Sequence, residues 1–459
     1  MNFWTSKNYK NKVSCIMTES ASARALLPLA LFLALFLGAG IYFQQTGVDM
    51  AFYQLASPVA ILPAIILGVL LSKQKFEERI NTFVAGVGER NIVTMCMIYL
   101  LAGAFSTVAA ATGGVDAMVA LGLNVIPASF LLPGLFIIAA VVSTAMGTSM
   151  GTLAALAPVA LGLGQAAEID LALLAGVLVS GAMFGDNLSI ISDTTIAATR
   201  TQGCNMSDKF KANLKISIPA AIITLIWLVT YDTGAVPPKI PEANLWLSLP
   251  YFFIIVLAVM GLNVFAVLTL GIILAAAFGM VTVGYEWVAF SKDIYAGFVS
   301  MQEIFFLSLL IGGLSALIRQ QGGLKFLSNT VSNATKKLFK HQQQRAAFGV
   351  AGLTGLTNLA VANNTVTILL SGEVSKRLAE EGNLAPRQSA SLLDIFACVV
   401  QGVLPYGAQA LLMGASFGLA PIEVSVHTGY CFILAAVAIA MIIWRKPLEG
   451  REKLEPSTT

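Results

Sequence analysis

Long apolar runs separated by short polar or basic stretches make up most of the chain. A helix needs roughly 20 apolar residues to cross the ~30 Å hydrocarbon core of a bilayer. We therefore expect about ten spanning helices, at 25–43, 50–71, 92–111, 170–199, 213–231, 246–260, 262–281, 303–318, 388–418 and 422–444. Polar residues interrupt the runs at 170–199 and 388–418, which predicts a broken helix at each.

Two other segments, 129–167 and 346–379, are too long for one crossing and contain Gly and polar residues midway. We expect each to be a re-entrant hairpin that returns to the side from which it enters. With two hairpins, all basic clusters fall on one side, 25 Lys and Arg residues against Lys239 and Lys292 on the other. The positive-inside rule then predicts that both termini are cytoplasmic.

A faint internal repeat supports this topology. Small residues of one segment recur 209 residues later: Gly103, Ser106, Gly113 and Gly114 match Gly312, Ser315, Gly322 and Gly323. The predicted order of elements recurs as well, and the span near 213–231 would invert the second copy. We expect a cytoplasmic segment at 1–24, a first repeat at 25–200, a linker with an extra span at 201–245, a second repeat at 246–418, and a last span with a cytoplasmic tail at 419–459.

Composition excludes most other classes. Apolar residues make up 57% of the 459 residues and charged residues 11%, against about 25% charged in soluble proteins. The net charge of +3 gives no indication of nucleic-acid binding. The five cysteines show no paired spacing, so neither a disulfide framework nor a zinc site is expected. Inverted repeats with broken helices are typical of secondary transporters, and no cofactor is expected.

The first hairpin turns through alternating Gly and hydroxyl residues at 143–152. We expect Thr148, Ser149 and Thr152 to line the substrate pathway, since unwound backbone in a membrane lines a polar cavity. The alternative is close helix packing through Gly147 and Gly151.

The first broken span contains two carboxylates within an apolar crossing, Asp186 and Asp193. Charged groups inside a membrane cost several kcal/mol and are functional by default. We predict a cation- or proton-binding site at this break, with the candidates Asp186, Asn187, Ser189, Ser192, Asp193, Thr194 and Thr195. Alternatively, Asp193 is only the N-cap of the second half-helix.

The second repeat carries fewer charges. Its hairpin turns at Asn363, Asn364 and Thr365, which either line the pathway or satisfy turn backbone. Asp394 is the carboxylate of the second broken span, and we assign it to the cation and proton site, although it lies close enough to the span's end to snorkel. Glu373, near Lys376 and Arg377, is expected to form an interfacial ion pair. No Lys or Arg is expected mid-membrane beside these carboxylates.

Two other classes of multispan protein fit the sequence less well. An intramembrane aspartyl protease needs a GxGD motif, whereas this chain reads Met183-Phe184-Gly185-Asp186 and has no Tyr-Asp pair mid-span. A channel would be expected to show a repeated selectivity filter, and none is apparent. The sequence therefore predicts a transporter rather than an enzyme.

These motifs resemble the NhaC-type sodium/proton antiporter family. The segment 148–152 is similar to that family's G-T-S-W-G-T element, and 185–195 to its G-D-x-x-S-P-x-S-D-T-T element. Asp394 and the pair Pro405 and Tyr406 resemble its later acidic residue and P-W pair. The resemblance implies a 5+5 inverted repeat with two hairpins, exchange of Na⁺ for H⁺ across the bacterial inner membrane, and Na⁺ coordination around Asp186, Ser192, Asp193 and Thr194.

The chain also departs from the family pattern, and the departures leave the main substrate open. Met150 replaces a Trp, Ile190 replaces a Pro, and the Asn363–Asn364 region replaces an Asp. The alternative function is a Na⁺- or H⁺-coupled carrier or exchanger of a small carboxylate or amino acid. Because no Lys or Arg is expected mid-membrane to pair with a substrate carboxylate, the sequence favours plain antiport. Expected partners are the lipid bilayer and small cations, and a homodimer and an organic substrate stay open.

Overall fold

The computed structural model describes residues 20–46, 48, 54–125, 127, 130–190, 192–231, 242–260 and 262–444. Every element of these residues is a helix. The helices of the first half are η1 Ala23–Leu26, α2 Leu27–Gln45, α3 Ser57–Ala60, α4 Leu62–Leu71, α5 Phe76–Val87, α6 Arg90–Ala111, α7 Gly114–Val125, α8 Leu131–Met146, α9 Ser149–Ala166, α10 Leu171–Leu188, α11 Asp193–Gln202 and α12 Met206–Thr230.

The second half continues in the same manner from Leu245 to Trp444. Its helices are η4 Leu245–Ser248, α13 Leu249–Val259, α14 Val264–Thr282, α15 Trp287–Ser300, α16 Gln302–Gln320, α17 Gly323–Leu338, α18 Gln342–Val361, α19 Asn364–Glu381, α20 Pro386–Val403, α21 Ala408–Phe417, α22 Pro421–Val426 and α23 Gly429–Trp444. Among the described residues, eight helical segments are long and apolar enough to cross a membrane. The predicted all-α membrane class is therefore confirmed.

The apolar runs became helices close to the predicted places. The expected spans near 50–71, 246–260 and 422–444 correspond to shorter apolar helices. Both segments expected as hairpins fold as helix–turn–helix pairs, α8–α9 and α18–α19. Both expected breaks are present, between α10 and α11 and between α20 and α21. The N-terminal basic segment, Lys239 and the tail after Trp444 lie outside the described residues.

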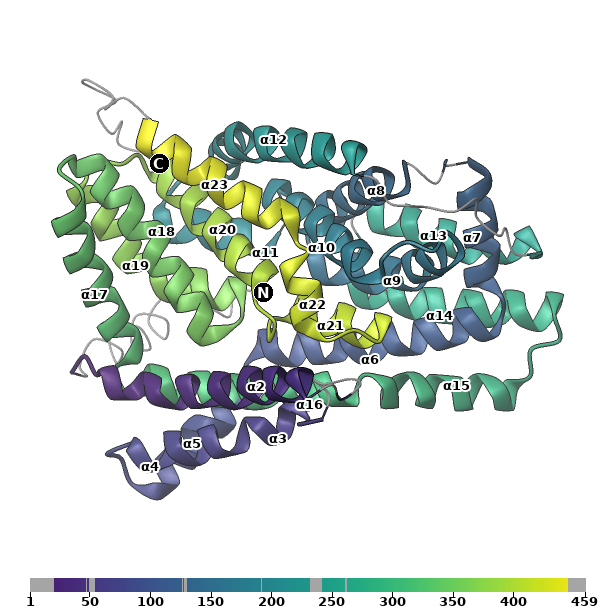
Figure 1. Cartoon of the computed structure of the whole chain (residues 1–459), viewed down its shortest axis with the longest axis horizontal. Helices are drawn as coiled ribbons and strands as arrows, with labels where there is room; N and C mark the ends of the chain where they lie inside the picture. The colour runs from purple at the N-terminus through teal and green to yellow at the C-terminus, as the bar shows by residue number, and fades with distance from the viewer. Residues whose placement is uncertain are drawn as a thin grey trace, which may run out of the picture.

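Figure 1 shows how these elements are arranged. The helices α2, α15 and α16 lie in a row toward one edge of the molecule, with α3, α4 and α5 beyond α2, and α12 lies along the opposite edge. Toward one end of the long axis lie α18 and α19, and toward the other lie α8 and α9, with α10, α11 and α20 between the two pairs. The broken helices are thus held between the two hairpins.

The turns of the two hairpins have the same local design. Gly147 ends α8 in the left-handed conformation with φ of 70°, and Ala362 ends α18 there with φ of 51°. The next residue caps the following helix in each case, because Thr148 accepts from the N–H of Gly151 and Asn363 accepts from that of Val366. The polar tip residues therefore satisfy the backbone that each turn leaves unpaired.

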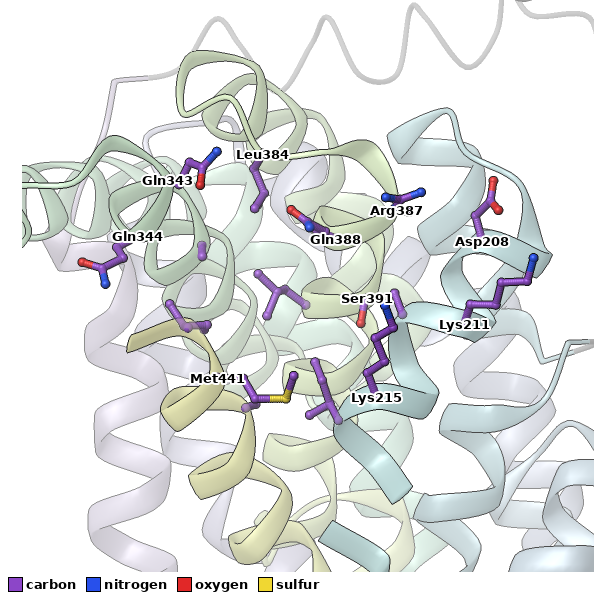
Figure 2. A pocket seen from close by; sticks show the side chains of 16 residues that line it. Asp208, Lys211, Lys215, Gln343, Gln344, Leu384, Arg387, Gln388, Ser391 and Met441 are labelled. Carbon is purple, nitrogen blue, oxygen red and sulfur yellow. The ribbon is translucent and has the colours of Figure 1, made fainter. Parts of the chain in front are cut away.

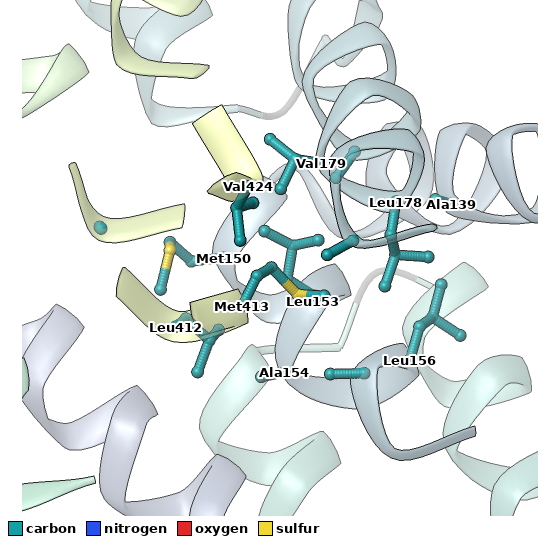
Figure 3. Close-up of a cluster of buried hydrophobic side chains, with 14 of the residues drawn as sticks. Ala139, Met150, Leu153, Ala154, Leu156, Leu178, Val179, Leu412, Met413 and Val424 are labelled. Carbon is teal, nitrogen blue, oxygen red and sulfur yellow. The ribbon is translucent and has the colours of Figure 1, made fainter. Parts of the chain in front are cut away.

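A cavity of about 230 Å³ opens where the ends of α12, α18, α20 and α23 meet. Figure 2 shows the side chains that line this cavity. Away from this cavity the interior is closely packed. Figure 3 shows Leu153 and Leu156 of α9 with Leu178 of α10, beside Leu412 and Met413 of α21. This packing brings the first hairpin against the second broken helix, so residues from both halves of the chain share one centre.

Candidate functional site

Asp186 lies at the end of α10, immediately before the break, and its side chain is 5% exposed. Oδ1 accepts a hydrogen bond from Ser192 Oγ at 2.6 Å. Oδ2 accepts from Ser149 Oγ at 2.9 Å and from the Ser149 backbone N–H at 3.4 Å. No described Lys, Arg or His forms a salt bridge with it. Asp186 is therefore a buried carboxylate held by hydroxyls without a cationic partner.

The break itself is organised by its hydroxyl residues. Ser192 is the N-cap of α11, where its Oγ accepts from the Thr194 N–H at 3.3 Å and lies 3.0 Å from Thr194 Oγ1. Thr195 Oγ1 donates to the Ser189 carbonyl at 2.7 Å. Of the four residues expected around Na⁺, the structure brings Asp186, Ser192 and Thr194 together, and Ser149 of the hairpin joins them. Their role in cation binding stays a prediction.

Other predicted residues of this break have different surroundings. Asp193 occupies the first turn of α11 with an exposed side chain, and Ser192 rather than Asp193 is the N-cap. Asn187 is fully buried, and within the described residues neither its amide nor the Ser189 hydroxyl has a hydrogen-bond partner. A role for Asp193 in cation binding stays a prediction from the sequence.

Asp394 lies in α20 with no exposure at all. Its Oδ2 is 2.6 Å from Lys209 Nζ and accepts from Asn213 Nδ2 at 2.8 Å. Lys209 is 1% exposed. The expectation that no basic residue would pair a carboxylate within the bundle was therefore wrong. Lys209 belongs to α12, and it is buried because a fully enclosed Asp394 needs a counter-charge.

The spacing along α12 contained a signal for this burial. Lys209, Asn213 and Ser217 recur every four residues and lie on one buried face, whereas Lys211 and Lys215 are exposed. A polar stripe with helical period points inward when it runs through an otherwise apolar helix. The prediction that all basic clusters lie on the cytoplasmic side ignored this phase and therefore missed the burial of Lys209.

The two carboxylates belong to one polar region. The Asn187 carbonyl, next to Asp186 in the chain, accepts from Lys209 Nζ at 3.2 Å and from Asn213 Nδ2 at 2.8 Å. Lys209 Nζ also donates to Thr195 Oγ1 at 2.6 Å. Lys209 thus connects Asp394 to the break that contains Asp186.

A second connection runs through residues that were not predicted to belong to the site. Gln401 Nε2 donates to the Ala362 carbonyl at 3.2 Å and to Gln409 Oε1 at 3.0 Å. Gln409 Nε2 donates to Ser149 Oγ at 3.1 Å, and Ser149 donates to Asp186. A chain of hydrogen bonds therefore joins the second hairpin turn to the Asp186 carboxylate.

The second hairpin is built around Asn358. Its Nδ2 donates to the Ala397 carbonyl at 2.7 Å and to Asn364 Oδ1 at 3.2 Å, and its Oδ1 accepts from Thr367 at 3.2 Å. Asn363 is the cap described above, and Thr365 is half-buried. The paired amides thus hold the turn together.

The remaining pathway candidates lie near the turns. Tyr406, which follows Pro405 in the second break, donates its hydroxyl to the Leu359 carbonyl at 2.7 Å. In the first hairpin, Thr152 Oγ1 donates to the Thr148 carbonyl at 3.0 Å. The Tyr406 bond ties the second break to the second hairpin, whereas the Thr152 bond is local to the start of α9. At the exposed surface, Glu373 pairs with Arg377, which confirms the expected ion pair.

The oxygen atoms around Asp186 are the type of ligand that a hard cation prefers. One carboxylate and the hydroxyls of Ser149, Ser192 and Thr194 lie together there. In the described part of the chain, no group of three or more His, Cys, Asp or Glu residues could hold a metal ion. The donor set suits a weakly held monovalent cation better than a resident metal.

An all-helical bundle with eight candidate spans and a buried charged centre at two broken helices defines a polytopic membrane transporter. The model of the Na⁺/H⁺ antiporter family matches residues 3–232 and 241–445. The chain belongs to this family and is a membrane antiporter-family protein rather than an enzyme.

Individual relatives are distant but nearly full-length. The chain is 24% identical over 447 residues to the malate-2H⁺/Na⁺-lactate antiporter of Bacillus subtilis, covering 90% of this chain and 92% of that protein. It is 22% identical over 386 residues to the Na⁺/H⁺ antiporter NhaC of the same organism, covering 77% and 83%. Among solved structures, the YdaH transporter of Alcanivorax borkumensis is 15% identical with a TM-score of 0.42, covering 92% of this chain and 98% of that one.

Proposed function

We propose that this protein exchanges Na⁺ for H⁺ and that Asp186 is the carboxylate that binds the two ions in turn. The observation that carries the proposal is the burial of Asp186 with no salt-bridge partner among the residues that the structure describes. An isolated ionised carboxylate in such surroundings is costly. A bound proton or a bound Na⁺ removes that cost, and one carboxylate cannot hold both.

The charges of the centre support one-for-one competition. Lys209 and Asp394 form a pair whose charges cancel, which leaves Asp186 as the remaining charge. Ser149, Ser192 and Thr194 supply neutral oxygens for Na⁺ around it. Ion release on alternate sides of the membrane then requires the hairpins to move relative to the broken helices, since both groups supply ligands.

We further propose a 5+5 inverted repeat with two re-entrant hairpins. Three consecutive helices of the first half have counterparts in the second half that begin and end 215 residues later. The pairs are α9 with α19, α10 with α20, and α11 with α21. The same offset pairs two equivalent bonds, Ser143 Oγ to the Ala182 carbonyl at 2.6 Å and Asn358 Nδ2 to the Ala397 carbonyl. It also relates the starts of α12 and α22, so the repeats would extend to about 230 and 444 rather than ending at 200 and 418.

A coupled carrier of a small carboxylate is the second candidate function. Lys209 favours it, because a buried ammonium beside the break could bind a substrate carboxylate once Asp394 is protonated. The relative that exchanges malate and lactate agrees with this candidate. We place the protein in a bacterial inner membrane with both termini cytoplasmic, and a homodimer stays a prediction.

One experiment separates the two functions. Purified protein is reconstituted in liposomes with a pH-sensitive dye inside, and Na⁺ is added with and without malate, lactate or amino acids. Alkalinisation of the lumen on adding NaCl to acid-loaded liposomes is expected for antiport. A dye response that appears only when an organic solute is present would reject plain antiport in favour of the carrier.

A further inference from the structure

The cavity in Figure 2 lies apart from the ligands of Asp186 and has a lining of its own. Four helices contribute to it: α12, α18, α20 and α23. Apart from Leu384, which lies just before α20, the lining residues come from the first turns of α12, α18 and α20 and from the last turns of α23. The cavity therefore lies at one end of the bundle, where we place the cytoplasmic surface of the membrane.

The polar part of the lining is positively charged. Lys211, Lys215 and Arg387 line it together with Asp208, a net charge of +2. Figure 2 shows the Lys215 side chain extending toward Ser391. Ser391 is 2% exposed, and its hydroxyl has no hydrogen-bond partner among the described residues. The Ser391 hydroxyl is therefore able to hydrogen-bond to a ligand in the cavity.

The lining also has an apolar part. Ile216, Leu392, Met441 and Ile442 lie there. Outside the cavity, the same two helices expose apolar side chains, which are 38–60% exposed: Ile218, Ile222 and Ile226 of α12 and Ile439 and Ile443 of α23. A ligand in this cavity would thus have an anionic group beside the lysines and an apolar part along the two helices.

We propose that this cavity binds the phosphate of an anionic phospholipid, with an acyl chain along α12 and α23. Basic pockets between spanning helices on the cytoplasmic side suit anionic headgroups. A free inorganic phosphate offers the same anionic oxygens, but it would leave the apolar wall and the outer isoleucines without a partner. These apolar surfaces favour the lipid as the source of the phosphate.

The bound lipid would also affect the packing around the buried pair of Lys209 and Asp394. Ser391 precedes Asp394 by three residues in α20, and Lys211 and Lys215 lie within two turns of the buried Lys209 along α12, on the exposed side of that helix. A ligand that joins α12 to α20 at this level stabilises the packing that keeps Lys209 against Asp394. Bound anionic lipid should therefore raise the thermal stability of the protein.

The test uses the full chain, purified and stripped of lipid in detergent. Its melting temperature is measured while phosphatidylglycerol, phosphatidylcholine or inorganic phosphate is added, and native mass spectrometry counts the bound lipids. We expect phosphatidylglycerol to raise the melting temperature saturably with one tightly retained lipid. An equal effect of phosphatidylcholine, or an equal effect of phosphate at millimolar concentration, would overturn the lipid assignment.

Matched variants locate the site. Lys211→Gln with Lys215→Gln should weaken phosphatidylglycerol binding about thirtyfold, since each Lys near anionic lipid contributes roughly a factor of five. The control variant, Lys336→Gln with Lys337→Gln, removes two exposed charges from α17, which does not line the cavity. It should change phosphatidylglycerol binding less than about twofold. Ser391→Ala removes one hydroxyl and no charge, and it should also weaken phosphatidylglycerol binding. Equal binding by all the variants would disprove the site.

Discussion

At the scale of single residues, the centre depends on which carboxylate is enclosed and how its charge is balanced. Asp186 and Asp394 are both buried, but only Asp394 has a salt-bridge partner, Lys209, within the described part of the chain. Removing one member of a buried pair is costly because the other charge is left uncompensated. The two aspartates should therefore respond differently to the same substitution.

Asp186→Asn should abolish Na⁺-driven proton movement in liposomes while the protein stays folded. The amide keeps the size and hydrogen-bonding oxygen of the carboxylate but cannot exchange Na⁺ for a proton. Asp193→Asn is the matched control in the same motif, and its exposed position leads us to expect more than about half of the activity of the unmodified protein. The reverse ranking of the two variants would move the ion site from Asp186 to Asp193.

Asp394→Asn should alter the pH dependence of transport. With its carboxylate gone, Lys209 loses its counter-charge, and the charge beside the Asp186 break changes. Transport by the unmodified protein should weaken as pH falls, because protons displace Na⁺ from Asp186. The pH profile of Asp394→Asn should be shifted or flat, whereas Glu373→Gln at the exposed pair should keep the original profile. Equal, mild effects would confine the ion site to the first broken helix.

At the scale of elements, the contact between α8 and α10 positions the site. A Cβ added at Gly185 would lie 2.4 Å from the Ala140 carbonyl oxygen and 2.6 Å from Ser143 Cβ. These distances are too short for any side chain, so the helices can approach this closely only with Gly at 185. The neighbouring Asp186 is held in place by this contact.

Gly185→Ala should therefore destabilise the protein by about 1–3 kcal/mol, the usual cost of overpacking. It should also reduce exchange, because α10 must move and carry Asp186 with it. Gly38→Ala is the control, since a Cβ there has nothing within 4 Å. Stability is measured as the melting temperature, with size-exclusion chromatography used to detect the protein that remains folded after heating. The liposome assay measures exchange. An unchanged melting temperature for Gly185→Ala would contradict this account of the contact.

At the scale of the whole molecule, the proposed repeat makes Gln401 the counterpart of Asp186, 215 residues later. Because Gln401 has an uncharged amide where Asp186 has a carboxylate, the second broken helix adds no charge at this position. With one net charge at the centre, exchange should be electroneutral and independent of membrane potential. A potential set with K⁺ and valinomycin tests this, and a clear response of the unmodified protein would contradict the charge balance.

Gln401→Glu should make exchange sensitive to the same potential, since a second carboxylate then shares the centre. Gln165→Glu, at an exposed position near the end of α9, adds the same charge elsewhere and should leave exchange insensitive. Insensitivity of both variants would show that Gln401 is not equivalent to Asp186.

The proposed topology predicts opposite accessibility of the two hairpins. A cysteine at Gln165 should react with an impermeant maleimide from outside the cell, and a cysteine at Glu381 only from the cytoplasm. Both positions are exposed and follow the turn of their hairpin by one helix. Labelling of Gln165→Cys from the cytoplasm would reject the first re-entrant hairpin and the inversion with it.

The sequence alone determined the class of this protein, the places of its helices and most residues of the candidate site. Continuous apolar runs of spanning length fold as helices in a bilayer, because a helix pairs the backbone polar groups within the run itself. Carboxylates and hydroxyls inside such runs mark function because burying them is costly. Asp186, Ser192, Thr194 and Asp394 are all predicted on this basis from the residues themselves.

The tertiary structure decided which of these groups meet. The rotation of α12 about its axis places Lys209 inward and Lys211 outward, and that phase depends on packing against α20 and α23. The backbone path through the break buries Asp186 and exposes Asp193, although both lie in one motif. The bonds from Gln401 through Gln409 to Ser149 join segments that are 260 residues apart. Such contacts arise from the packing of distant helices, which local sequence patterns do not specify.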